Sequence, residues 1–214
     1  QMKTIFVSAL VAASASLAAA DTSVSVYGGV QTLPHSVVAG VHPETNDTYQ
    51  ETFAWEGKSF SMPAYYGMRV VSWNRNIGYG LEFTHAKAYA DEAEAADAGF
   101  NRLEFTDGHN IITANTWKRW DSNSTYIPYV GAGVGIAMPH VDAKTDSTST
   151  YGFQVTGPAI QLTAGIEKEI TTTVSTFAEY QFSYSWNKVE FENNGTMDVD
   201  LKTNALNLGL RLNF

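Results

Sequence analysis

The side chains that could carry chemistry in this chain are histidines, carboxylates and lysines that fall near the ends of alternating segments. Its five histidines are His35, His42, His85, His109 and His140. Imidazole beside a carboxylate is the combination that acid–base catalysis or a divalent metal site requires. Four of the histidines have a charged residue close in sequence: His42 with Glu44, His85 with Lys87, His109 with Asp107, and His140 with Asp142.

We predict a site at the extracellular ends of the strands. No spacing matches a tight metal motif such as His-Glu-x-x-His, so no metal ligand is assigned. The alternative for each residue is a charge that is simply solvated on a loop. Because residues of a strand alternate between its two faces, His85 and Lys87 are expected on the outward face of their strand unless a bulge intervenes. The candidate catalytic residues are Glu56, His85, Asp107, His109 and His140, and the candidate substrate-binding residues are Lys58 and Lys87.

A second set of charged residues falls on the inward face of the alternating segments. Charges buried there must be paired, because an isolated buried charge is costly. We therefore predict ion pairs inside the molecule, with Glu82 or Glu179 facing Arg69 or Arg211. The members of this group are Arg69, Glu82, Glu167, Glu179 and Arg211.

The strands that position these residues are predicted from apolar residues that recur at every second position. Leu206, Leu208, Leu210, Leu212 and Phe214 alternate with small or polar residues to the end of the sequence. Strict alternation over about ten residues is typical of a membrane-spanning β-strand, with its apolar face toward lipid. A final Phe on such a strand is typical of bacterial outer-membrane barrels.

Eight such segments follow one another, with short connections alternating with long ones. This pattern predicts an all-β fold, an eight-stranded antiparallel transmembrane β-barrel with long extracellular loops and an interior filled by side chains. The expected strands are 23–32, 53–73, 77–89, 109–120, 126–139, 157–168, 174–186 and about 205–214. The expected long connections are 33–53, 90–108, 140–156 and 187–199.

The beginning of the sequence predicts export. A positive residue, Lys3, precedes an apolar run, and three alanines end at residue 20, so 1–20 is expected to be a signal peptide and 21–214 the barrel. Gln1 precedes a start-like Met2 and is interpreted as a scar. The formal net charge is −9, which disfavours nucleic-acid binding, and the absence of cysteine excludes disulfides and thiolate metal sites.

Several blocks of this chain resemble the bacterial outer-membrane lipid A oxidase family, and together they cover essentially all of residues 21–214. The glycine-rich and C-terminal blocks are shared by many barrels, whereas the blocks around Trp55, His85 and Asp107 are more specific. The blocks are Tyr27–Ser36, Trp55–Pro63, Tyr65–Gly67, Gly80–Asp91, Leu103–Gly108, Tyr129–Gly135, Met138–Val141, Gly157–Ala159 and Thr203–Gly209.

The resemblance implies an outer-membrane enzyme that oxidises the proximal glucosamine of lipid A to an aminogluconate unit, using molecular oxygen and releasing hydrogen peroxide. Its partner would be lipid A or lipopolysaccharide of the outer leaflet, and we expect a monomer. No nucleotide or flavin is expected, and a divalent metal is a candidate helper. The main alternative is a non-catalytic barrel of the OmpA/OmpX type for adhesion or envelope structure. A lipid A deacylase is less favoured, because no Gly-x-Ser-x-Gly motif is present.

Overall fold

The computed structural model describes residues 21–120 and 125–214, so the predicted signal peptide and the predicted turn at 121–124 lie outside the described residues. Within the part of the chain that the structure describes, no helix is long and apolar enough to cross a membrane. The elements are β1 (Asp21–Val41), β2 (Thr48–Glu56), β3 (Tyr66–Asn74), β4 (Ile77–Ala90), α2 (Glu92–Asp97), β5 (Arg102–Arg119), β6 (Ile127–Lys144), β7 (Ser149–Phe153), β8 (Gly157–Glu169), β9 (Val174–Glu190), the 3₁₀ turn η2 (Glu192–Asn194) and β10 (Thr196–Asn213).

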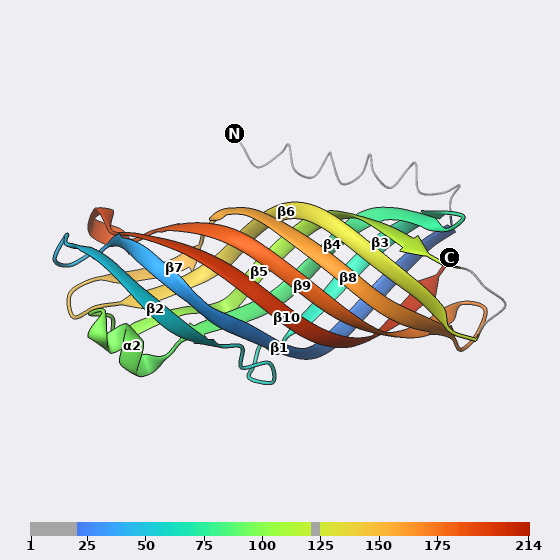
Figure 1. Ribbon diagram of the computed structural model, residues 1–214, viewed down its shortest axis with the longest axis horizontal. Helices are drawn as coiled ribbons and strands as arrows, with labels where there is room; N and C mark the ends of the chain where they lie inside the picture. The colour runs from blue at the N-terminus through green and yellow to red at the C-terminus, as the bar shows by residue number, and fades with distance from the viewer. Residues whose placement is uncertain (1–20, 121–124) are drawn as a thin grey trace.

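The strands close into a single antiparallel barrel (Figure 1). Eight strands form the ring, in the order β1, β3, β4, β5, β6, β8, β9, β10, and β10 pairs with β1 to close it. The two shorter strands extend the ring at its extracellular end, where β2 pairs with β1 and β4, and β7 pairs with β6. The predicted eight-stranded antiparallel barrel is confirmed.

The strands run farther than the sequence predicts. Much of each segment expected to be a long loop is strand, because β1 continues to Val41, β6 to Lys144 and β9 to Glu190. The predicted strand 53–73 is interrupted at residues 57–65, which leave the sheet between β2 and β3. We call residues 57–65 the strap. The barrel therefore stands well above its membrane belt, and the strap marks a break in its wall.

An apolar belt surrounds the lower barrel. The outward positions expected to face lipid are exposed in the isolated chain: Val130, Val134, Tyr180, Leu206, Leu208 and Leu210. Exposed aromatic residues flank the belt, with Tyr79 and Tyr126 toward the periplasmic end and Tyr66 and Trp186 toward the extracellular end. Aromatic girdles around a lipid-exposed apolar band are the pattern of a transmembrane barrel.

The position of Leu208 in the belt predicts how a charge there affects stability, since its side chain is 71% exposed on the outer face of β10. Leu208→Arg is expected to lower the free energy of unfolding by about 2–4 kcal/mol, since a cation near the bilayer midplane loses its hydration. Denaturant titration of barrels folded in lipid vesicles measures this. Leu212→Arg, close to the periplasmic end of the same strand, is the matched control and should cost about 0–1 kcal/mol. Equal costs at the two positions would contradict the assigned belt.

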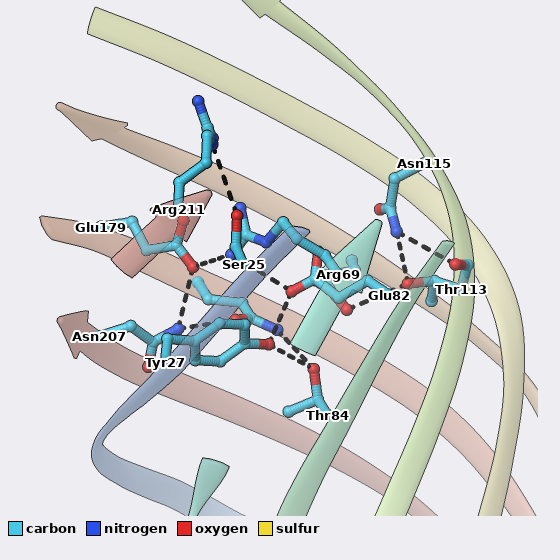
Figure 2. Close-up of polar contacts among 12 residues, drawn as sticks. Ser25, Tyr27, Arg69, Glu82, Thr84, Thr113, Asn115, Glu179, Asn207 and Arg211 are labelled. Carbon is cyan, nitrogen blue, oxygen red and sulfur yellow. Dashed lines mark hydrogen bonds and ion pairs between the residues drawn. The ribbon is translucent and has the colours of Figure 1, made fainter. Parts of the chain in front are cut away.

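The lower interior holds the predicted pairing of Glu82 and Glu179 with Arg69 (Figure 2). Arg69 donates to Glu179 and its Nη2 lies 3.4 Å from Glu82, and Arg211 donates to Glu167. Tyr27 completes the network by donating to Glu82 over 2.6 Å. Small residues on facing strands make room for bulky ones: a Cβ at Gly131 would lie 2.4 Å from the ring of Trp117. The glycine-rich run of β6 is thus a packing feature of the interior.

The upper interior is apolar. Side chains from most strands, with Ala95 of α2, fill the extracellular end of the barrel above the polar network. The cluster includes Leu33, Phe53, Trp55, Phe100, Leu103, Phe105, Val141, Val199 and Leu201. Charged groups inside the barrel are thus covered on the extracellular side by packed hydrocarbon.

Candidate functional site

The strap covers a gap in the strand pairing of the barrel wall. The ladder between β1 and β3 ends where Gly28 pairs with Tyr66, and the ladder between β1 and β2 begins where Leu33 pairs with Trp55. Gln31 spans the interval: its Nε2 donates to the carbonyls of Gly57 and Lys87 over 2.9 and 2.8 Å. Its backbone N–H also donates to the Ser59 hydroxyl over 2.9 Å. The strap is thus held against both β1 and β4 by polar contacts.

His85 and Lys87 lie on the outer face of β4, as parity predicts, but both are buried. His85 pairs in register with exposed Tyr66, whose ring stacks on the imidazole with centroids 5.1 Å apart. Lys87 is fully buried because its Nζ donates to the Ser61 carbonyl of the strap over 2.9 Å. A cation and an imidazole are therefore covered on the outside of the barrel, where sequence reasoning placed exposed residues.

A bulge in β5 brings Asp107 to the same outer face. Between the pairs Phe105–Val141 and His109–Pro139, β5 has three residues where β6 has one. The extra residues disturb the alternation and turn Asp107 outward. There Asp107 accepts from the Tyr151 hydroxyl over 3.4 Å, and its Oδ2 lies 3.7 Å from Nδ1 of His140.

His140 and His85 are linked through this bulge. The His140 ring packs edge-on against Tyr151 and Phe153 of β7, with centroids 4.4 and 4.6 Å away. On the β4 side, His85 Nδ1 and Asn110 Oδ1 are 2.9 Å apart. Asp107 and Lys87 are both close enough to His85 to act on it electrostatically. We call His85, Lys87, Asp107, Asn110 and His140 the outer-wall cluster.

Charged groups above the cluster act on one another electrostatically. Asp107 raises the pKa of the Tyr151 hydroxyl, chiefly by repulsion between the two anionic forms. Burial raises the pKa of Glu104, against the opposing attraction of Arg102. Arg102 in turn donates to Asp142 over 2.9 Å. The surface above the cluster is thus an organised set of ion pairs.

Glu56 and Lys58 border the cluster without joining its buried part. Their charged ends are 3.5 Å apart and partly exposed. The ammonium groups of Lys58 and Lys87 both approach the ring of Tyr89, at 4.3 and 5.2 Å from its centroid. The two predicted substrate-binding lysines therefore share one aromatic partner on the outer wall.

His109 is the candidate that the structure separates from the rest. Its side chain points into the barrel, where Nε2 and the Ser185 hydroxyl are 2.8 Å apart and the ring stacks beneath Phe105 of the apolar interior. The expectation that it gathers with the other candidates is wrong, because regular alternation carries Phe105 and His109 inward while the bulge alone turns Asp107 outward.

Sequence reasoning missed Asn110, Tyr151 and Tyr89. Parity was a usable signal for Asn110, which pairs in register with His85. Tyr151 belongs to β7, in a segment predicted to be loop, and nothing in its spacing indicated a contact with Asp107. Strand β7 reaches the cluster only because it pairs with β6, which places Tyr151 beside Asp107 and His140.

The cluster lies at the extracellular edge of the apolar belt. Phe83, one outward position below His85, belongs to the belt with its register partners Ile112 and Ile136. The next outward row holds His85 and Asn110. Polar groups on the outside of a barrel at that height meet the headgroups of the outer leaflet rather than its hydrocarbon.

The donor set does not fit a metal site. Among residues 21–120 and 125–214, no three His, Asp or Glu side chains converge in a way that could hold a metal ion. The nearest approach is the pair of Asp107 and His140. The divalent metal considered from the sequence therefore stays a prediction, which adding metal to the purified protein would test.

Gly108 is required for this geometry. It has φ +108°, and a Cβ there would lie 2.4 Å from the His85 ring and 2.7 Å from Asn110 Oδ1. Gly108→Ala is expected to destabilise the folded barrel by about 1–3 kcal/mol, since it adds backbone strain and displaces His85. Urea titration in lipid vesicles measures this, and Gly28→Ala, whose Cβ has only an ordinary contact with Tyr65 at 3.6 Å, is the control. Equal stability of both variants would contradict the tight approach.

Comparison with known proteins supports the fold and goes no further. No family model and no curated protein sequence matches the chain. Among solved structures, Neisserial surface protein A is 14% identical with a TM-score of 0.54, covering 90% of this chain and 97% of its own. The Ail protein of Yersinia pestis (10%, TM-score 0.45, covering 91% and 99%) and the outer-membrane protease OmpT of Escherichia coli (7%, 0.46, 91% and 97%) also align.

The chain therefore has the fold of the bacterial outer-membrane β-barrels. Together with its lipid-exposed belt, this makes it a membrane-embedded barrel of that class, in agreement with the predicted location in the outer membrane.

Proposed function

We propose that this protein is an outer-membrane lipid A oxidase whose chemistry takes place on the outside of the barrel wall. One observation carries the proposal. The three blocks that are most specific to that family are far apart in sequence, yet Lys58, His85 and Asp107 from them meet around one cluster with His140 of a fourth block. The cluster lies at headgroup height, where the sugars of lipid A reside.

The chemistry is a two-electron oxidation at C1 of the proximal glucosamine. The C1–H and hydroxyl O–H bonds break, and two electrons and two protons pass to molecular oxygen, which becomes hydrogen peroxide. C1 becomes a lactone carbonyl, which water opens to the aminogluconate. His85 is suited to accept the hydroxyl proton, because its Nδ1 lies 2.9 Å from Asn110 Oδ1, and an Nδ1–H donating to that oxygen leaves the lone pair on Nε2. Lys58 and Lys87 supply local cations to an anionic headgroup in a protein of net charge −9.

The test is lipid A mass from cells grown in air with and without this protein. The product is expected to be one oxygen atom heavier than the parent lipid, and anaerobic growth should abolish the change. Purified barrel in vesicles with lipid A, with and without added divalent metal, should release hydrogen peroxide in step with that product. Loss of an acyl chain would indicate a deacylase. Unchanged lipid A under all these conditions would overturn the proposal in favour of the non-catalytic OmpA/OmpX-type barrel.

A further inference from the structure

A groove of about 860 Å³ crosses the lipid-facing wall on the other side of the strap. It runs over β8, β9, β10 and β1, and its lining is mostly hydrocarbon. Small outward residues make its floor, namely Gly28, Ala164 and Ala178. Larger ones form its sides: Val30, Phe60, Ile166, Tyr180, Leu206 and Leu208.

The groove and the outer-wall cluster lie on one continuous row of the sheet. Successive register pairs join these outward residues across seven strands: Ile166, Ala178, Leu208, Gly28, Tyr66, His85 and Asn110. The row climbs, since Ile166 is three residues from the periplasmic end of β8 and His85 is eight residues from that of β4. A path from the cluster along this row therefore descends into the membrane and enters the groove.

The strap lies where the two meet. Several of its backbone groups are paired within the protein: Tyr65 N–H donates to the Ser59 carbonyl over 2.8 Å, and the Ser61 carbonyl accepts from Lys87. Irregular backbone at membrane depth requires this kind of pairing. Its large apolar side chains point outward instead, with Phe60 79% and Met62 86% exposed. Phe60 lines the groove, while the next residue, Ser61, covers Lys87.

We propose that the groove holds one acyl chain of the lipid whose headgroup is bound at the outer-wall cluster. This inference rests on the proposed function for the identity of that lipid. His85 is two strands from Gly28 along the row, roughly 10 Å at normal strand spacing. A disaccharide lipid with several chains has one available at that distance. Hydrocarbon gains little by leaving the bilayer for a protein groove, so the tether to a bound headgroup must concentrate the chain there.

The experiment uses lipid A carrying a photoreactive diazirine within one acyl chain, in phosphatidylcholine vesicles that contain the full-length folded barrel. Adducts are mapped by peptide mass spectrometry. Lipid A is expected to label groove peptides of β9 and β10 in preference to other lipid-facing peptides. Phosphatidylcholine with the same diazirine chain should label the belt evenly. Ala178→Phe, which fills the groove floor, should remove the preference.

Ala132→Phe is the matched control, because Ala132 is an exposed alanine of β6 outside the groove and should leave labelling unchanged. Heat-modifiable gel mobility confirms folding, and Gly28→Leu replaces Ala178→Phe if the latter fails to fold. Even labelling of the belt by lipid A, or equal labelling in the filled and control variants, overturns the groove. Preferential labelling by a barrel that never oxidises lipid A keeps the groove and refutes the oxidase. Oxidation of lipid A together with even labelling of the belt keeps the oxidase and refutes the groove.

Discussion

Replacing Arg69 by methionine is expected to lower the free energy of unfolding of the barrel by about 3–5 kcal/mol. Arg69 is fully buried between Glu82 and Glu179, and it is the cation that faces both. Removing one partner of a buried ion pair leaves the other charge uncompensated in a medium of low dielectric constant. Here two carboxylates would lose the same partner, and each would have to bind a proton or draw water into the packed interior.

The measurement is a urea titration in lipid vesicles, with an unrelated arginine as control. Arg75→Met changes an exposed side chain in the turn after β3 and should alter stability by less than about 0.5 kcal/mol. Adding Glu82→Gln and Glu179→Gln to Arg69→Met should restore much of the loss, because the uncompensated charges are gone. A loss below about 1 kcal/mol in the single variant would show that the network is not needed for stability.

This network was predictable from sequence because it depends on parity alone. Once alternation assigns a face to each residue of a strand, Arg69 and Glu179 fall on the same interior, and burial demands that they pair. Register between strands then follows from short turns such as that between Asn74 and Ile77. The barrel, its belt and its ion pairs all come from this one rule.

The outer-wall cluster was less predictable because it depends on departures from that rule. Asp107 is outward only because β5 holds two extra residues, and no local pattern around Gly108 specifies a bulge. The strap breaks a strand that alternation reads as continuous, and it buries Lys87 by a backbone contact from Ser61. Sequence thus named most of the residues, while tertiary pairing decided which of them meet.

His85 of β4 and His109 of β5 lie on neighbouring strands, but their side chains face opposite sides of the barrel wall. His85→Gln is expected to lower the rate of lipid A oxidation by about 10²–10⁴-fold, the usual contribution of a positioned acid–base group. Glutamine can still hydrogen-bond to Asn110 but cannot take up the substrate proton. His109→Gln should leave the rate close to the parental value, because its side chain contacts Ser185 and Phe105 inside the barrel.

The rates are measured as hydrogen peroxide release and lipid A mass gain by purified barrels in vesicles, with folding checked by heat-modifiable gel mobility. Since His85 and His109 are each buried and each next to a polar partner, a general loss of packing would affect both variants alike. Only a reaction on the outer wall separates them. A slow His109→Gln beside an active His85→Gln would move the chemistry to the interior, and two equally active variants would remove histidine from the proton transfer.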